Sequence, residues 1–148
     1  MNMFGMDDWQ ALIADERVLV TRDILRYNDM DDNGHLNNSV FTVLCESGRV
    51  DYFRKRVTPH LPGNTFFVIA RIAIDFKAEA FYPGEALTAT WLEHLGRSSL
   101  RVRQKIMSAD KLVAEAEGVC VVMDQTTRKP FPIPDATRAA LEPLLREG

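Results

Sequence analysis

The sequence lacks the markers of several classes of protein. It has two cysteines among 148 residues, and neither Cys45 nor Cys120 stands in a Cys-x-x-Cys or zinc-binding spacing, so no disulfide framework and no metal site is expected. We expect two buried thiols in a reducing compartment. No apolar run is long enough for a membrane helix, and residues 1–15 lack the basic start and apolar stretch of a signal peptide. These absences predict a cytoplasmic protein.

A surplus of positive charge is also missing. The formal net charge is −3 at pH 7, so no nucleic acid and no membrane is expected as a partner. Hydrophobic residues make up 46% and charged residues 26% of the chain, an ordinary mixture that can bury a core without metal or disulfide bonds. Repeats, low-complexity segments and linkers are absent as well. We therefore predict one domain over residues 1–148, with its core at about 17–124 and a C-terminal tail at 125–148.

Hydrophobic periodicity divides the chain into helices and strands. A short helix is predicted over residues 7–15 and a strand over 17–27. The segment near 38–55 has the spacing of a helix, with one face formed by Phe41, Leu44, Cys45, Gly48 and Tyr52. Further strands are predicted over residues 66–76, 86–95, 99–108 and 112–123. The fold class is therefore α+β, an antiparallel sheet of about five strands wrapped around one long central helix.

Three details of this pattern make finer predictions. Gly48 costs a helix about 1 kcal/mol relative to Ala, and we expect that it allows close approach to the sheet. Asp135 is expected to cap a short closing helix. Within 66–76, alternation predicts one wholly apolar face formed by Phe66, Val68, Ala70, Ile72, Ile74 and Phe76.

The most unusual stretch is the polar loop over residues 26–38. It is rich in Asp and Asn, includes His35, and lies between the first predicted strand and the long helix. Loops on a rigid scaffold often carry binding and catalytic groups. This loop also ends at a helix start, where unpaired backbone N–H groups can hold a developing negative charge. The loop is therefore the first candidate for a functional site.

A longer pattern resembles a known family. It runs Asp29-x-Asp31-x-x-Gly34-His35-x-Asn37-Asn38 and continues with Phe41 and Glu46-x-x-Arg49. This pattern resembles the hotdog-fold acyl thioesterases of the 4-hydroxybenzoyl-coenzyme A thioesterase-like and acyl-carrier-protein thioesterase-like groups. Weaker matches follow in the expected order, at Ile74-Asp75-Phe76, Tyr82-Pro83-Gly84-Glu85 and Gly96-Arg97-Ser98-Ser99. The resemblance covers about residues 17–124.

The resemblance implies an activity and an assembly. The substrate would be an acyl-coenzyme A or acyl-carrier-protein thioester, with coenzyme A present as part of the substrate and no further cofactor. The assembly would be a homodimer or homotetramer in which two sheets pair edge to edge. Active sites would then lie at the subunit interface.

The resemblance also implies roles for four residues of the loop. Asp31 matches the catalytic carboxylate, and such a group serves as a nucleophile or as a general base for water. An amide matching Asn38, at the start of the helix, polarises the thioester carbonyl. Asn33 would orient substrate or water, and His35 is a candidate proton carrier. One bacterial branch has a histidine at the position of Asn38, so its mechanism is not carried over.

Candidate substrate-binding residues are Asn37, Glu46, Arg97 and Ser98, and each has a structural alternative. The Asn37 side chain is expected to form local hydrogen bonds in the loop, as is that of Asp29. Glu46 has its simplest partner in Arg49, three residues later. The charged stripe that begins at Arg97 is typical of a solvated sheet face.

Other functions remain open alternatives. A hotdog dehydratase or hydratase is the nearest, although its Pro-Gly pattern before the helix is missing. A non-catalytic acyl-thioester binder would be stabilised by its ligand without hydrolysing it. A calcium loop is rejected because Val40, not glutamate, stands at its twelfth position. A carboxylate within the helix is not supported either, because Thr42 occupies that position.

Overall fold

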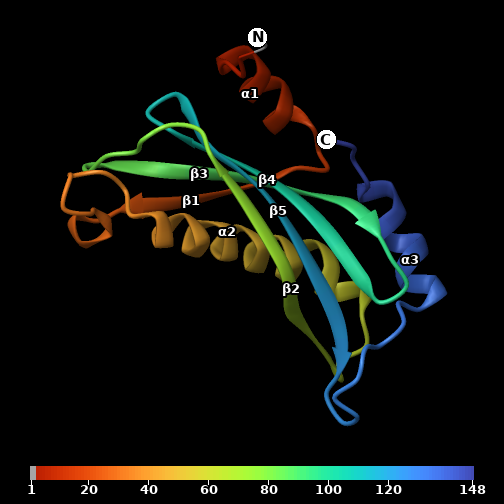
Figure 1. Cartoon of the computed structure of the whole chain (residues 1–148). Helices are drawn as coiled ribbons and strands as arrows, with labels where there is room; N and C mark the ends of the chain where they lie inside the picture. Colours follow the sequence, from red (N-terminus) through yellow and green to blue (C-terminus); the bar gives the residue numbers. More distant parts are fainter. Residues whose placement is uncertain (1–2) are drawn as a thin grey trace.

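The computed structural model describes residues 3–148 and has a five-stranded antiparallel sheet curved around one long helix (Figure 1). The sheet order is β1-β3-β4-β5-β2, so β1 and β2 are the two edge strands. The strands are β1 (Leu19–Leu25), β2 (Thr65–Phe76), β3 (Gly84–Leu95), β4 (Ser99–Ser108) and β5 (Lys111–Asp124). This arrangement confirms the predicted fold class.

Helix α2 (Asn38–Tyr52) lies along the concave face of the sheet (Figure 1). A π-helical turn, η2 (Phe53–Val57), and a short 3-10 helix, η3 (Thr58–His60), continue it. The predicted face is confirmed, since its five residues are all buried: Phe41, Leu44, Cys45, Gly48 and Tyr52. Among residues 3–148, no helix combines the length and the apolar character that crossing a membrane requires.

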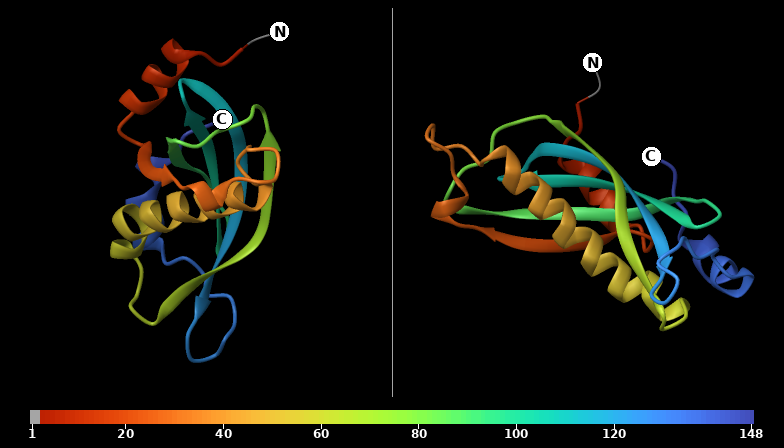
Figure 2. Two further views of the ribbon diagram at one scale, coloured as in Figure 1. Left: turned by 90° about the vertical axis from the view of Figure 1, so that its left-hand side faces the viewer. Right: turned by 60° about the horizontal axis from the view of Figure 1, so that its bottom comes forward.

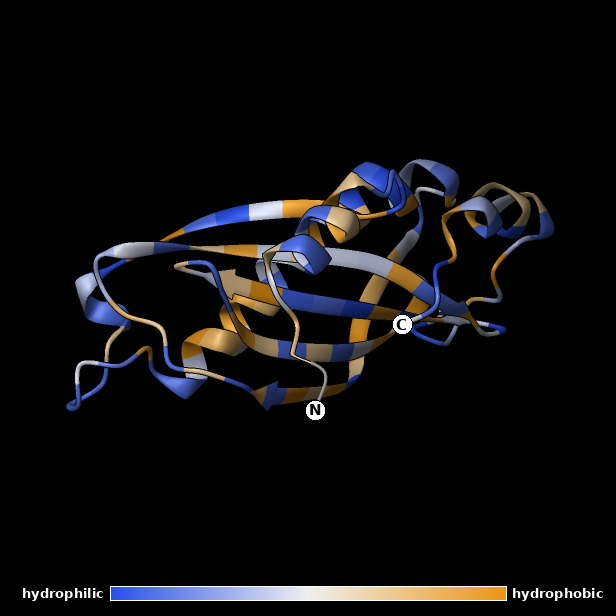
Figure 3. Ribbon diagram, turned by 90° about the horizontal axis from the view of Figure 1, so that it is seen from above, coloured by the Kyte–Doolittle hydropathy of each residue, from blue (hydrophilic) through white to orange (hydrophobic). Residues whose placement is uncertain are grey.

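The opposite face of the sheet is partly covered by helix α1 (Met6–Ala14), as Figures 2 and 3 show. Trp9 and Leu12 on this helix pack against Trp91 and Met107 of the sheet. Helices α3 (Asp135–Leu141) and η4 (Glu142–Leu144) lie at the end of the sheet where β3 ends and β4 begins (Figure 1). Asp135 is the first residue of α3 and not its cap, a position that Pro134 occupies. The predicted cap at Asp135 is therefore wrong by one residue.

Strand β2 departs from the predicted alternation. Its pairing with β5 leaves out Ala70, which forms a β-bulge. Before the bulge, Phe67 faces the helix layer and stacks on Phe53, with 4.6 Å between the ring centroids. After the bulge, Ile74 packs against the core under α2. The extra residue reverses the side-chain direction, so the predicted apolar face is wrong for Phe66, Val68 and Ala70.

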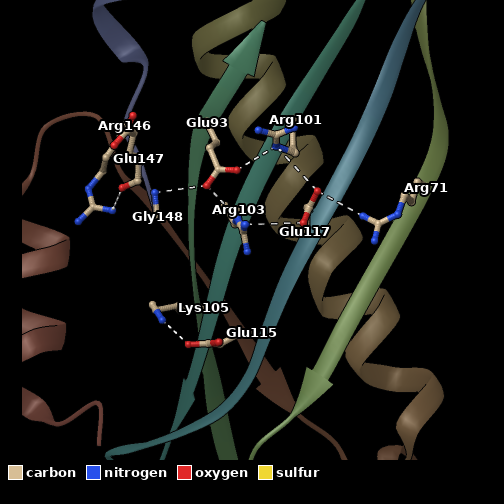
Figure 4. Close-up of polar contacts among 10 residues, drawn as sticks. All are labelled: Arg71, Glu93, Arg101, Arg103, Lys105, Glu115, Glu117, Arg146, Glu147 and Gly148. Carbon is tan, nitrogen blue, oxygen red and sulfur yellow. Dashed lines mark hydrogen bonds and ion pairs between the residues drawn. The ribbon is translucent and has the colours of Figure 1, made fainter. Parts of the chain in front are cut away.

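Cross-strand ion pairs cover much of the outer sheet face (Figure 4). Glu93 on β3 accepts hydrogen bonds from Arg101 and Arg103 on β4, at 2.9 and 2.8 Å. Glu117 on β5 lies 3.2 Å from Arg71 on β2. Partial burial raises the pKa of Glu93, but the bonds from the two arginines outweigh it and lower the pKa overall. The charged stripe is thus largely self-neutralised, as expected for a solvated sheet face.

Helix α2 approaches the sheet closely at Gly48. A Cβ atom there would lie 2.8 Å from Thr88 Cγ2 and 2.8 Å from Gln104 Nε2. The buried Gln104 amide donates to Cys45 O at 2.9 Å and to Thr90 Oγ1 at 3.0 Å. The predicted reason for a glycine in this helix is therefore confirmed, because any side chain would push α2 away from β3 and β4.

The Gly48→Ala variant should be less stable than the wild type, despite the better helix propensity of alanine. Propensity favours alanine by about 1 kcal/mol, but overpacking and the displaced Gln104 amide should leave a net loss of about 1–3 kcal/mol. Denaturant unfolding measures the difference. Gly63→Ala is the matched control, since no atom lies within 4 Å of its Cβ position. Equal stability of the two variants would contradict the close-approach interpretation.

Candidate active site

The polar loop lies between β1 and α2 and is closed on itself. Met30 and Leu36 form an isolated antiparallel bridge, and Leu36 N donates to Ala80 O at 2.8 Å. The second bond holds the segment that follows β2 against the loop. Residues from two distant parts of the chain therefore meet at the N-terminal end of α2.

Asp31 organises the tip of this loop. Its Oδ1 accepts hydrogen bonds from Asn33 N at 2.8 Å and from His35 N at 3.1 Å. Asp31 N donates to His35 O at 2.7 Å, and Gly34 takes the positive φ of 76° that this turn requires. Oδ2 accepts no hydrogen bond from residues 3–148. The carboxylate is thus held by one oxygen and has the other free.

Asp29 anchors the loop to the end of β1. Its carboxylate accepts from Arg26 N at 2.8 Å and from Arg26 Nη2 at 3.2 Å, and its backbone oxygen accepts from Asn37 N at 2.9 Å. Partial burial raises the pKa of Asp29, but the bonds from Arg26 outweigh this effect and lower the pKa below its usual value of 3.8. Asp29 therefore has the local hydrogen-bonding role expected for it.

His35 is held from two sides. Its Nδ1 lies 3.4 Å from Glu79 Oε1, and its ring makes an edge-on contact with Phe81, with 5.4 Å between centroids. Both partners belong to the segment after β2. The imidazole is therefore oriented beside the loop while part of it stays open to solvent.

The start of α2 leaves one backbone donor free. Asn37 is the N-cap, and its side-chain oxygen accepts from Ser39 N and from Ser39 Oγ, each at 3.0 Å. Val40 N donates to Asn37 O at 2.9 Å. The N–H of Asn38 has no acceptor among the described residues. With the helix dipole behind it, this N–H is suited to a negatively charged oxygen.

These groups surround one pocket of about 320 Å³. Three of the four predicted catalytic residues line it: Asp31, His35 and Asn38. The remaining lining residues were not predicted as site residues: Leu36, Phe41, Phe76, Lys77, Ala78 and Glu79. Lys77 and Glu79 directly follow the matched triplet Ile74-Asp75-Phe76, the signal by which they could have been found.

The other predicted site residues lie elsewhere in the chain. Asn33 is exposed at the loop tip, and Asn37 uses its side chain to cap α2. Glu46 is exposed and lines a different groove, between α2 and β1. Arg97 and Ser98 form the β3–β4 turn, at the opposite end of the sheet from the loop (Figure 1). Within one chain, none of these side chains lines the pocket.

The expected pairing of Glu46 with Arg49 does not form. Arg49 is buried and points to the sheet, where its Cδ lies 3.3 Å from the position of a Cβ on Gly118. In the described part of the chain its Nη1 has no hydrogen-bond partner. Glu46 is exposed to the solvent, and burial of the Arg49 side chain against the sheet keeps the two side chains apart.

Both thiols are free and buried, as predicted. Burial raises the pKa of Cys45 to about 11, partly offset by the positive charge of Arg49. The pKa of Cys120 is raised for the same reason. Neither is suited to act as a nucleophile at neutral pH. Among residues 3–148 there is also no group of three or more His, Cys, Asp or Glu side chains that could hold a metal ion.

Comparison with known proteins identifies the family. A model described as the thioesterase-like superfamily matches residues 25–141. The chain belongs to the thioesterase-like superfamily. This membership confirms the predicted family and, with the topology, the hotdog fold. It also supports thioester hydrolysis as the general activity. A search of the curated proteins found no match.

Solved thioesterases have the same fold. A predicted thioesterase from Bacillus stearothermophilus is 29% identical, covers 88% of this chain and 98% of its own, and superposes with a TM-score of 0.79. A thioesterase from Thermus thermophilus, complexed with coenzyme A and Zn, is 30% identical over 86% of this chain and 93% of its own, with a TM-score of 0.73. A DHNA-CoA thioesterase from Staphylococcus aureus, 19% identical over 78% and 80% of the two chains with a TM-score of 0.70, shares the fold.

Replacing Asp29 tests the anchor of this loop. Asp29→Asn should lose about 1–2 kcal/mol of stability at pH 7, because a charged acceptor is replaced by a neutral one. The pKa of Asp29 is lower in the folded state than in the unfolded state, where it is near 3.8. The resulting gain in the free energy of unfolding is complete above pH 3.8 and disappears as the pH falls through the folded-state pKa. Wild type and variant should therefore have similar stabilities below the folded-state pKa of Asp29. Denaturant unfolding across the range measures this, with exposed Asp32→Asn as the control, and a pH-independent difference would contradict it.

Proposed function

We propose that this protein hydrolyses acyl thioesters of coenzyme A with Asp31 as the catalytic carboxylate. The observation that carries the proposal is a single pocket with one free acceptor and one free donor. Asp31 Oδ2 and the Asn38 N–H have no partner among residues 3–148, and both residues line that pocket. Thioester hydrolysis needs this pair, a carboxylate to start the attack and a donor to stabilise the oxyanion.

The remaining residues would assist these two. Asp31 attacks the carbonyl carbon, or takes a proton from the water that attacks it, and the carbonyl oxygen becomes an oxyanion. The Asn38 N–H and the α2 dipole stabilise this charge. When the intermediate collapses, the C–S bond breaks and the thiolate takes a proton from His35, whose ring Glu79 and Phe81 orient. If water is the nucleophile, the acid forms directly, and the proton that Asp31 took up replaces the one that His35 gave away. If Asp31 is the nucleophile, the acyl group remains on Asp31 as a mixed anhydride, which a water molecule hydrolyses to the acid and the free carboxylate. Asn33 is proposed to orient substrate or water from the loop tip.

The proposed reaction uses no cofactor, because water and the protein supply both reacting groups. Coenzyme A enters as the thiol part of the substrate, a choice supported by the Thermus thermophilus thioesterase complexed with coenzyme A. An acyl-carrier protein presents the same thioester and is the other donor to be compared. Two free, buried thiols fit the cytoplasm, where we propose that the enzyme works.

The two edges of the sheet differ in a way that favours pairing through β2. On β1, Thr21 Oγ1 donates to Asp51 Oδ2 at 2.6 Å, and Asp23 also faces α2, where it accepts from Ser47. Inward-pointing charges of this kind block edge pairing. On β2, four apolar side chains have 37–52% of their surface exposed: Val68, Ile69, Ile72 and Phe76. We propose that a second copy pairs with β2 in a homodimer, or in a homotetramer built from such dimers.

This dimer would complete the site. Antiparallel pairing along β2 brings the C-terminal end of one strand against the N-terminal end of the other, by two-fold symmetry. Phe76, at the C-terminal end, lines the site pocket. Near the N-terminal end, Phe67 pairs with Val122, whose N–H donates to Ser98 O at 2.8 Å. We therefore propose that the second copy supplies Arg97 and Ser98 to the substrate.

Asp31→Asn should lower kcat for acyl-coenzyme A hydrolysis by about 100-fold or more, the usual size of a lost general base. The amide keeps an oxygen for the Asn33 and His35 N–H groups, so the fold should persist. The measurement is thiol release from a panel of acyl-coenzyme A esters, with Asp32→Asn as the matched loop control. Absence of wild-type turnover on every ester, or full activity of a folded Asp31→Asn variant, would refute the proposal. Ligand-induced stabilisation without turnover would then indicate a binding protein, and hydration of crotonyl-coenzyme A a hydratase.

The assembly is tested by placing one lysine on each edge strand. Ile72→Lys on β2 should convert the wild-type oligomer to a monomer, because it buries a charge between paired strands. Ile24→Lys on β1, where Ile24 is 77% exposed, should keep the wild-type mass. Light scattering during size exclusion measures both masses. A monomeric wild type at micromolar concentration, or an Ile72→Lys variant of unchanged mass, would rule out pairing through β2.

A further inference from the structure

A second cavity adjoins the site pocket. This cavity, the lysine groove, has a volume of about 590 Å³ and is lined by Met3, Phe4, Lys77, Ala78, Asp110, Lys111, Leu112 and Glu115. Lys77 and Ala78 also line the site pocket. The groove therefore begins where the site pocket ends, on the other side of the short segment that follows β2.

Two lysines, Lys77 and Lys111, line the groove beside Asp110 and Glu115, and a third, Lys105, lies next to it. Lys105 pairs with Glu115 (Figure 4) and lies over the Phe4 ring, 4.7 Å from its centroid. Lys77 Nζ is 4.0 Å from the same Glu115. Lys111 forms no ion pair within residues 3–148. Three lysines thus face the two carboxylates of Asp110 and Glu115, in a chain whose net charge is −3.

The ion pairs determine which lysines keep a positive charge that no carboxylate neutralises. The hydrogen bond from Lys105 is the main cause that lowers the pKa of Glu115, and burial opposes it. Glu115 therefore stays ionised and is shared mainly with Lys105. Lys111 is left unpaired at one end of the groove, and Lys77 is only loosely paired at the junction with the site pocket. An anionic ligand would meet these two cations first.

The site pocket is small for a whole coenzyme A thioester. Its 320 Å³ is at the low end of ligand pockets, which span about 300–1,000 Å³. A coenzyme A thioester has, beyond its sulfur, a long arm of amides and methyl groups that ends in a nucleotide with phosphates. The groove offers apolar contacts from Phe4 and Leu112 and cations for the phosphates.

We propose that the lysine groove binds the phosphate-bearing arm of the coenzyme A thioester. The arm passes from the reacting carbonyl beside Asp31, along Lys77 and Ala78, to the phosphates at Lys77 and Lys111. Lysine binds phosphate as a point charge, so no planar guanidinium is needed. This inference rests on the proposed function and adds a specificity site to it. Lys77 and Lys111 are the residues that distinguish a coenzyme A ester from a shorter thioester.

One wall of the groove lies outside the part of the chain that the family model matches. Phe4 belongs to the segment before α1, and the family match begins at residue 25. Helix α1 holds this segment over the sheet through Trp9 and Leu12, which are almost fully buried. The N-terminal segment therefore turns an open sheet face into a groove, next to a site built from family residues.

The test compares coenzyme A with pantetheine, which has the same thiol arm without the nucleotide. In calorimetry, Lys111→Met should weaken coenzyme A binding about fivefold relative to pantetheine binding, the loss expected for one half-exposed ion pair. Lys111→Arg should retain most of the preference. The KM ratio of the two acyl thioesters should fall by the same factor. Added salt should weaken coenzyme A binding to the wild type more than to Lys111→Met.

Lys129→Met is the matched control, because Lys129 is exposed in the loop after β5 and lies outside the groove. It should leave the preference for coenzyme A unchanged. An unchanged preference in Lys111→Met, or an equal loss in Lys129→Met, would overturn the proposal. So would a Lys111→Met variant that loses affinity for an acyl-carrier protein but not for coenzyme A. Calorimetry with free coenzyme A needs no turnover, so failure of the groove and failure of the proposed hydrolysis are distinguishable.

Discussion

The contact between α2 and the sheet at Gly48 is the constraint on which the other features of the molecule depend. The helix comes so close to Thr88 and Gln104 that no side chain fits between them, and the Gln104 amide fixes the distance by donating to the helix backbone. A helix held at this depth has its N-terminal end at a defined place beside the end of β2. The loop before the helix and the segment after β2 therefore meet, and the pocket forms between them. The position of the polar groups at the start of α2 therefore depends on the packing of Gly48, about three turns further along the helix.

The candidate site consists of polar groups that the fold leaves free. Around it nearly every group is used: Asp29 holds Arg26, Asn37 caps the helix, and one oxygen of Asp31 accepts two backbone bonds. Such bonds stiffen the loop and prevent the carboxylate from turning toward the nearby N–H groups. For the proposed reaction, a fixed free acceptor and a fixed free donor that belong to residues lining one pocket would provide the electrostatic preorganisation that acyl transfer requires. A looser loop would let both groups form hydrogen bonds within the chain, and neither would then be free for a substrate.

The sequence was enough to predict the order of elements, the buried face of α2 and most of the polar groups at its start. Each of these depends on local spacing, such as the three- and four-residue repeat from Phe41 to Tyr52. The errors and omissions concern non-local features. The bulge at Ala70 reverses half of β2, and no residue type in that stretch signals it. Lys77 and Glu79 reach the pocket through the Leu36–Ala80 hydrogen bond, which joins positions 44 residues apart in the numbering and leaves no periodic trace. Glu46 and Arg49 are three residues apart, yet burial of Arg49 against Gly118 separates them.

The two edge strands of the sheet differ in exposure, and the N-terminal helix lies outside the part of the chain that the family model matches. Strand β1 is protected by the bonds that Thr21 and Asp23 make with α2, whereas β2 has an exposed apolar side beside the pocket. This difference between the edges supports the proposed pairing of two copies through β2 beside the candidate site. Helix α1 lies on the opposite face and outside the family match, where it is not needed to form the pocket. The segment before α1 lines the lysine groove through Met3 and Phe4, and neither of these residues lines the site pocket. For the proposed function, changes in this segment would therefore alter binding of the thiol arm and leave Asp31 and Asn38 in place.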